Sequence, residues 1–160
     1  MGAGLVFKCK NCNYELDVNL GIGFRYTYLC SNLLENMKTG KMGKTFQNAA
    51  NSIENPAVYA SKSLYLCENC GELKPALNIA LCSPINEPKE KNRCFSTVCE
   101  CFEYNTYVMA YELNNTYKTV HLKEYRCGKC KTKMKKITSY RNLKCPQCQN
   151  KLKSSEYFWD

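Results

Sequence analysis

Four C-x-x-C pairs constrain the fold of this chain more than any other feature. Eight of its 13 cysteines belong to such pairs, which we call knuckles. Two knuckles together supply the four thiolates that surround a tetrahedral Zn²⁺, and four cysteines leave no open coordination position. The spacing therefore predicts two four-cysteine sites and two Zn²⁺ per chain. The knuckles are Cys9/Cys12, Cys67/Cys70, Cys127/Cys130 and Cys145/Cys148.

The rest of the sequence favours metal over disulfides as the role of these cysteines. The first residues lack the long apolar segment and cleavage site of a signal peptide. No apolar run approaches the roughly 20 residues that a membrane-spanning helix needs. We therefore expect a cytoplasmic protein without a membrane segment. In the reducing cytosol, closely spaced cysteines typically bind metal.

Neighbouring knuckles are the simplest pairs to bring together. Residues 131–144 separate the last two knuckles, a spacing typical of structural zinc sites. Residues 13–66 separate the first two, but the entropic cost of loop closure grows only logarithmically with length. We therefore predict one site per half of the chain, and crossed pairings, such as the first knuckle with the third, remain open. The first site is Cys9, Cys12, Cys67 and Cys70, and the second is Cys127, Cys130, Cys145 and Cys148.

A helical insertion is predicted between the first two knuckles. Apolar residues recur at helical spacing between residues 25 and 38, and residues 44–53 form a second, weaker helical segment. Strand character resumes at residues 63–66, immediately before Cys67. The insertion therefore covers about residues 25–55. The apolar residues of its first helix are Leu29, Leu33, Leu34 and Met37.

Two prolines and alternating charges mark residues 84–93 as a linker or loop. This boundary predicts an N-terminal module over residues 1–83 and a second module over residues 94–160. In the second, residues 102–113 and 116–126 are predicted to form a β-hairpin before Cys127. The predicted fold class is mostly β, or α+β, with two modules of short antiparallel hairpins and a helical insertion in the first.

The remaining candidates for chemistry are weaker. No serine–histidine–aspartate set, phosphate-binding loop or H-E-x-x-H motif is present, so we expect a protein that is not an enzyme. The single histidine, His121, is expected to be exposed or half-buried on a strand and not a ligand. Cys30 is predicted to lie in the core. A third metal site or buried free cysteines remain alternatives for Cys82, Cys94, Cys99 and Cys101.

Positive charge is concentrated near the C-terminus. Residues 117–160 contain 12 Lys and Arg against three Asp and Glu, whereas residues 1–116 are balanced. Cations interspersed with an aromatic residue are typical of surfaces that contact phosphates and stack on bases. An acidic protein partner and a solvated face are the alternatives. The candidate nucleic-acid-binding residues are Lys129, Lys131, Lys133, Lys135, Lys136, Tyr140, Arg141 and Lys144.

Residues 125–130 (Tyr-Arg-Cys-Gly-Lys-Cys) and 143–148 (Leu-Lys-Cys-Pro-Gln-Cys) resemble a zinc ribbon of the rubredoxin-like structural class. The two N-terminal knuckles resemble the same arrangement, interrupted by the helical insertion. The resemblance covers about half of the chain and implies that each knuckle lies at the tip of a β-hairpin. It is specific for metal ligation and does not specify a function.

Three hypotheses follow for the function. The first is a non-catalytic, zinc-stabilised binding module that contacts nucleic acid through residues 129–144. The second is a protein–protein adaptor or regulator that uses the helical insertion. The third is a rubredoxin-like electron-transfer protein, since iron accepts the same four thiolates as zinc. None of the three requires a small-molecule substrate or a membrane.

Overall fold

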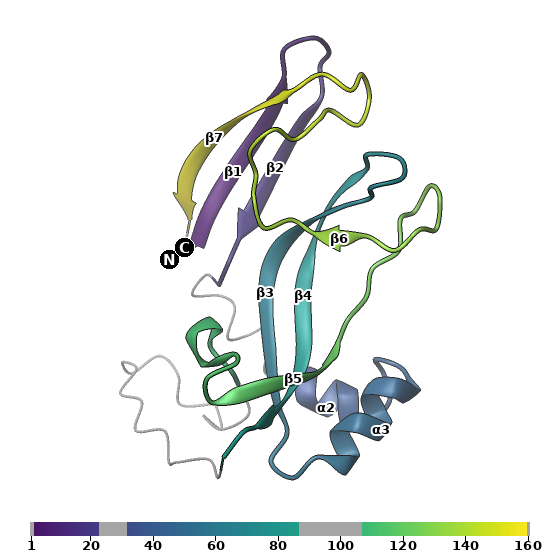
Figure 1. The fold of residues 1–160 in the computed structure, drawn as a ribbon, viewed down its shortest axis with the longest axis vertical. Coiled ribbons are helices and arrows are strands. Elements are labelled where there is room, and N and C mark those ends of the chain that lie inside the picture. Colours follow the sequence, from purple (N-terminus) through teal and green to yellow (C-terminus); the bar gives the residue numbers. More distant parts are fainter. Residues whose placement is uncertain (1, 23–31, 87–106, 160) are drawn as a thin grey trace. The chain divides into compact units, whose positions relative to one another are not determined.

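The computed structural model describes residues 2–22, 32–86 and 107–159 (Figure 1). The chain forms two compact units, and each is assembled from separate segments of sequence. Unit 1 comprises residues 1–25, 61–78 and 124–160, and unit 2 comprises residues 26–60 and 79–123.

This division differs from the predicted modules at residues 1–83 and 94–160. Each unit takes segments from both halves of the sequence, because strands that are distant in the chain pair with each other. Most of the predicted linker at 84–93 lies outside the described residues, and Pro84 is the last residue of a strand.

Unit 1 contains a three-stranded antiparallel sheet of β1 (Gly2–Cys9), β2 (Glu15–Leu20) and β7 (Leu152–Trp159). The strand order is β2-β1-β7, so the C-terminal strand pairs with the N-terminal one along its full length (Figure 1). The C-terminal aromatic segment therefore docks on its own chain. Alternate side chains of β1 and β2 point into the core, as expected for strands with one buried face. These are Leu5, Phe7, Val18 and Leu20.

A second sheet contains β3 (Ala57–Leu66), β4 (Leu73–Pro84), β5 (Tyr117–Leu122) and β6 (Lys135–Lys136) in the order β5-β4-β3-β6. The two long central strands contribute residues to both units. In unit 1, β6 pairs with the end of β3. In unit 2, β5 pairs with the end of β4. The resulting architecture is mostly β.

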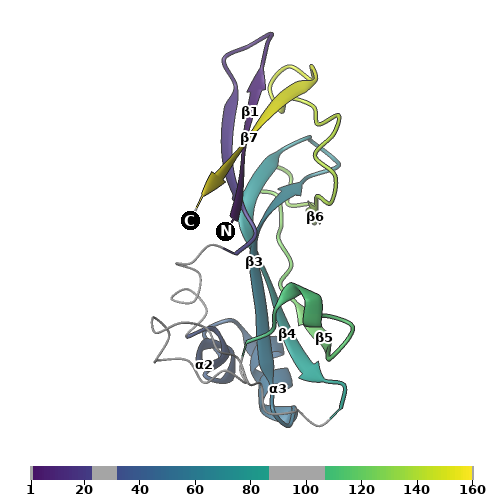
Figure 2. The same cartoon turned by 90° about the vertical axis from the view of Figure 1, so that its left-hand side faces the viewer.

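Unit 2 contains the helices α2 (Leu33–Lys38) and α3 (Lys44–Ser52), which lie next to each other (Figure 1, Figure 2). They confirm the helical character of the predicted insertion, although residues 23–31, with Cys30, lie outside the described residues. Phe46 of α3 meets the ring of His121 edge-on, with centroids 4.4 Å apart. His121 is half-buried, as expected.

The predicted hairpin before Cys127 is partly wrong. Its second arm exists as β5, but β5 forms its ladder with β4. In the described part of the preceding segment, Leu113 forms an isolated parallel bridge with Tyr117, which is not a hairpin ladder. Within that segment, residues 110–112 form the short 3₁₀ helix η2 (Ala110–Glu112), and residues 102–106 lie outside the described part. The carboxylate of Glu112 accepts a hydrogen bond of 2.7 Å from the backbone N–H of Met109. This bond stabilises the start of η2, where a strand would otherwise continue.

Candidate metal centres

All four knuckles share one local turn. The backbone N–H of the first cysteine donates to the carbonyl five residues later, at 2.8–3.0 Å. In three knuckles, the N–H of the fourth residue after that cysteine also donates back to its carbonyl. This second bond requires a left-handed backbone conformation, in which glycine is the least strained residue. The three residues are Gly71 (φ 75°), Lys131 (φ 62°) and Gln149 (φ 62°).

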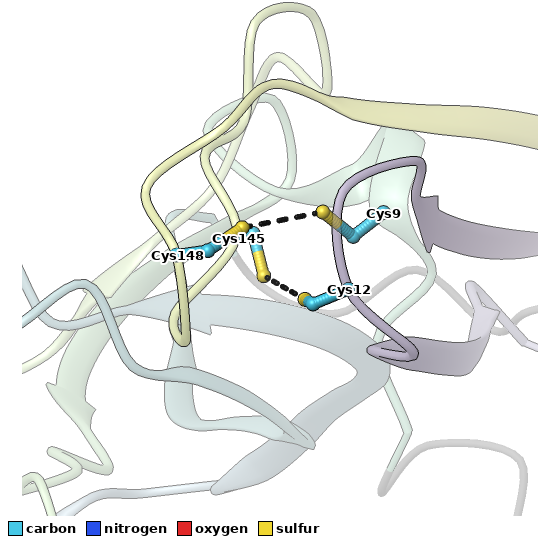
Figure 3. A group of neighbouring side chains, drawn as sticks. All are labelled: Cys9, Cys12, Cys145 and Cys148. Carbon is cyan, nitrogen blue, oxygen red and sulfur yellow. Dashed lines mark hydrogen bonds between the residues drawn. The ribbon is translucent and has the colours of Figure 1, made fainter.

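The turns bring four cysteines of the first and last knuckles together (Figure 3). We call this group, Cys9, Cys12, Cys145 and Cys148, cluster 1. The Sγ atoms of Cys9 and Cys148 lie 3.4 Å apart, and those of Cys12 and Cys145 lie 3.5 Å apart. A disulfide needs about 2.0 Å, whereas Zn–S bonds of about 2.3 Å give a tetrahedron with S–S edges of about 3.8 Å. Cluster 1 therefore has the dimensions of a metal site.

The two middle knuckles form a second group, cluster 2, with the same dimensions. The Sγ atom of Cys130 lies 3.3 Å from that of Cys67 and 3.7 Å from that of Cys70. The Sγ atoms of Cys70 and Cys127 lie 3.5 Å apart. In each cluster the four sulfur atoms lie within 4.8 Å of one another. Both clusters lie in unit 1, and each could hold one metal ion. The members of cluster 2 are Cys67, Cys70, Cys127 and Cys130.

The predicted pairing of neighbouring knuckles is therefore wrong. The first knuckle meets the fourth, and the second meets the third. Strand pairing explains this arrangement, because each knuckle follows or precedes a paired strand end. Cys9 is opposite Leu152, the first residue of β7, which places the first knuckle beside the last. Leu66 is opposite Lys135, which places the second knuckle beside the third.

Sequence reasoning missed this pairing because it compared loop lengths alone. Joining the second knuckle to the third closes a loop of residues 71–126, against residues 131–144 for the predicted second site. This difference of about two doublings costs only about 1 kcal/mol. The eight-pair ladder between β1 and β7 outweighs a term of that size, and the short ladder between β3 and β6 adds to it. The three consecutive aromatic residues at 157–159 were the available signal, since such residues favour a strand, and a strand needs a partner.

Each cluster contains at least one thiol that ionises easily. The side chain of Thr132 is the main group that lowers the pKa of Cys130 from 9.0 to about 5. Its hydroxyl lies 3.4 Å from the sulfur atom. In cluster 1, the Asn150 side chain, 3.5 Å from the sulfur, lowers the pKa of Cys148 to about 6. A group that donates to the thiolate favours the form that binds metal.

Each cluster also contains a thiol that keeps its proton. The backbone N–H of Tyr14 favours the thiolate of Cys12, but burial and the neighbouring sulfur atoms raise its pKa to about 12. The backbone N–H of Glu72 likewise favours the thiolate of Cys70. The neighbouring sulfur atoms and burial favour the protonated thiol more strongly, so its pKa also rises to about 12. Four thiols packed this closely cannot all ionise without a cation between them, so metal binding must release protons.

Ion pairs connect the two knuckles of cluster 2. Lys129 pairs with Glu72 at 2.5 Å, and Lys135 pairs with Glu68 at 2.7 Å. A third lysine of the predicted basic surface, Lys133, pairs with Glu124. Exposed pairs of this kind contribute at most about 1 kcal/mol each. Their main consequence is local neutralisation of three cations that the sequence assigned to nucleic acid.

The other residues of the predicted surface have different environments. Tyr140 is half-buried and packs against Phe7, with ring centroids 6.3 Å apart, so its ring contributes to the core. The ammonium group of Lys131 donates to the carbonyl of Gly128 at 3.0 Å. Lys131 is exposed and lies outside the described ion pairs, as do three further exposed cations, Lys136, Arg141 and Lys144.

Three of the four cysteines of the candidate third site lie outside the described residues. Cys94, Cys99 and Cys101 are not among them. Cys82 is buried on β4, and burial raises its pKa to about 11. Within the described segments, the cysteines that gather around a common point are those of clusters 1 and 2.

Comparisons with protein-family models, with curated proteins and with solved structures find no match. The fold and the site therefore define the class: a mostly β protein with two four-cysteine groups in one compact unit. Among the helices of the described residues, none has the length and apolar character needed to cross a membrane.

Proposed function

We propose that this protein is a non-catalytic, zinc-stabilised module of zinc-ribbon type that binds nucleic acid through the positively charged surface of unit 1. The observation that carries the proposal is the distribution of charge. Unit 1 contains 15 Lys and Arg against seven Asp and Glu, a net charge of +8, and unit 2 has a net charge of only +1.

The charge remains positive after metal binding. Each Zn²⁺ held by four thiolates contributes about −2 relative to the neutral thiols, so two sites leave about +4 on unit 1. A surplus of this kind attracts the phosphate backbone of nucleic acids, because phosphate contacts release condensed counterions. An acidic protein is the competing partner, and it would respond to the same charge.

Four thiolates support a structural role for each metal. A catalytic zinc site keeps one position for water or substrate, whereas four cysteines fill the tetrahedral shell. The metals would then stabilise unit 1, because the free energy of metal binding contributes directly to folding in sites of this kind. Zinc fits this role, and iron would occupy the same geometry in an electron-transfer protein.

The test is binding of a fluorescent 20-nucleotide RNA or DNA strand of mixed sequence, measured by anisotropy at several salt concentrations. The proposal predicts binding that weakens as salt increases, with a slope of about −0.7 for each phosphate contacted. Metal analysis of the same sample should give two zinc ions per chain. Absence of salt-dependent binding by the zinc-loaded protein would refute the nucleic-acid hypothesis, and iron with a red colour would favour electron transfer.

Two triple variants would test the contribution of the predicted C-terminal surface. Lys136→Gln/Arg141→Gln/Lys144→Gln removes cations that lie outside the described ion pairs. The matched control, Lys129→Gln/Lys133→Gln/Lys135→Gln, removes the same charge from lysines that pair with glutamates. The first variant should bind more weakly than the control. Equal binding by the two would show that this segment does not contact the nucleic acid.

A further inference from the structure

A hollow in unit 1 lies next to cluster 1. Its volume is about 500 Å³, compared with about 30 Å³ for one water molecule in the liquid. It is thus large enough for a phosphodiester with part of its hydration shell. Three lysines and two asparagines line it, all of them exposed. They are Lys10, Asn11, Asn150, Lys151 and Lys153.

The lining comes from both ends of the chain. Lys10 and Asn11 belong to the first knuckle, between Cys9 and Cys12, and Asn150 follows the last knuckle. The pairing of β1 with β7 brings these segments together, since Cys9 is opposite Leu152. Separately, the two segments are ordinary polar loops. The hollow is therefore a product of the knuckle pairing and is not visible in the sequence.

The cations of this region have no acidic partner in the part of the chain that the structure describes. The described ion pairs involve Lys8, Lys129, Lys133 and Lys135, and none includes Lys10, Lys151 or Lys153. Lys151 is also directly opposite Lys144 in an isolated β-bridge. Like charges placed opposite each other destabilise a sheet unless an anion lies near them.

Cluster 2 provides an internal comparison. In the Cys67/Cys70 knuckle, Glu68 occupies the position that Lys10 occupies in the Cys9/Cys12 knuckle of cluster 1. Glu72 follows two residues after Cys70. These glutamates neutralise Lys135 of β6 and Lys129 of the facing knuckle, respectively. A bound metal would give both clusters the same charge, so the metal alone does not explain why one set of lysines has carboxylate partners and the other does not.

We propose that the hollow is a phosphate-binding subsite that takes a backbone phosphate of a nucleic acid. The three ammonium groups supply the positive charge, and the side-chain amides of Asn11 and Asn150 supply neutral donors. This inference rests on the proposed function and adds a specific place for the contact. That place lies outside the C-terminal surface predicted from the sequence, on the face formed by the first and last knuckles.

The experiment compares two double variants of the full-length, zinc-loaded protein. Lys10→Gln/Lys153→Gln removes two cations of the hollow. Lys133→Gln/Lys135→Gln removes two cations that pair with Glu124 and Glu68, so the net charge is the same in both. The probe is the same fluorescent 20-nucleotide strand. Zinc content and thermal unfolding confirm that both variants are folded, which is expected because all four lysines are exposed.

The hollow variant should bind about tenfold or more weakly, and its salt slope should be shallower by about 0.7, since one phosphate contact is lost. The control should stay within about threefold of the wild type. Equal losses in the two variants would mean that only net charge matters and would overturn the subsite. Unchanged binding by the hollow variant would also overturn it, while leaving the proposed function standing. If the wild type binds no oligonucleotide, both proposals fail.

Discussion

The aromatic ring of Tyr157 covers the backbone of Gly4 on the neighbouring strand. The two residues are direct partners in the β1–β7 ladder. A Cβ atom placed on Gly4 would lie 2.1 Å from Cζ of the ring. The hydroxyl of Tyr157 reaches across β1 and donates to Asp17 of β2 at 2.5 Å. One side chain thus connects all three strands of the sheet, and only glycine leaves room for it.

Gly4→Ala is therefore expected to destabilise unit 1. The added methyl group forces the ring out of its position, and overpacking of this kind costs about 1–3 kcal/mol. Urea unfolding of the zinc-loaded protein would measure the loss. The control is the same substitution in a Tyr157→Ala background, where the space is empty and the penalty should disappear. An equal penalty in both backgrounds would contradict the contact.

The pairing of knuckles predicts which cysteine substitutions act together. Cys9→Ser/Cys148→Ser damages cluster 1 alone, so this variant should retain one zinc ion per chain. Cys12→Ser/Cys70→Ser damages both clusters and should retain none, because three thiolates bind the metal much more weakly than four. Native mass spectrometry would count the ions.

Pairing between neighbours in sequence reverses both outcomes, since Cys12 and Cys70 would then share a site while Cys9 and Cys148 would belong to different sites. Retention of one zinc by the Cys12→Ser/Cys70→Ser variant would therefore refute the observed arrangement. Cys82→Ser is a suitable control, because Cys82 lies in neither cluster. It should retain both ions.

The ligand set was accessible from the sequence, but its grouping was not. The spacing of eight cysteines indicates four tight turns, and a turn is a local structure that local sequence determines. The partner of each turn depends on which strands pair, and the ladders between β1 and β7 and between β3 and β6 join distant segments. Loop entropy changes by about 0.6 kcal/mol per doubling of length, so it cannot select among pairings when the ladders differ by more.

The basic surface shows the same limit. Counting charges located most of the positive excess, since residues 124–160 supply +7 of the net charge of +8 on unit 1. The count could not show that Lys129 and Lys135 pair with Glu72 and Glu68, which lie 57 and 67 residues earlier in the chain. Nor could it show that Lys10, near the N-terminus, shares a hollow with Lys153.

At the residues with left-handed backbone conformation beside the knuckles, substitution to alanine and substitution to glycine should have opposite effects on stability. Gly71 has φ 75°, so Gly71→Ala should cost about 1 kcal/mol, although the added methyl group would make only ordinary contacts with Gln149. Lys131→Gly relieves the same strain at φ 62° and should be neutral or slightly stabilising.

Gly128→Ala is the matched control for these variants. Gly128 also lies in a knuckle, but its φ is not positive and no atom lies within 4 Å of the position of an added Cβ. Thermal unfolding of the zinc-loaded variants would rank the three. A destabilisation by Lys131→Gly as large as that by Gly71→Ala would be inconsistent with conformational strain at these positions.

Acid release of the metal should depend on Thr132. Its side chain lowers the pKa of Cys130 from 9.0 to about 5, so this thiolate resists protonation. The pKa of Cys130 is lower in the folded state than in the unfolded state. The stabilisation from its thiolate is therefore complete above about pH 9 and is lost as the pH falls toward about 5. Thr132→Val removes the donor and raises the pKa of Cys130, so protons displace the metal of cluster 2 at a higher pH.

A chromophoric chelator would follow zinc release as the pH is lowered. In the Thr132→Val variant, about half of the zinc should leave at a pH about 0.5 higher than in the wild type, because cluster 1 does not contact Thr132. Thr138→Val, at an exposed threonine, should release zinc as the wild type does. A release curve for Thr132→Val that coincides with the wild-type curve would show that this hydroxyl does not stabilise the thiolate of Cys130.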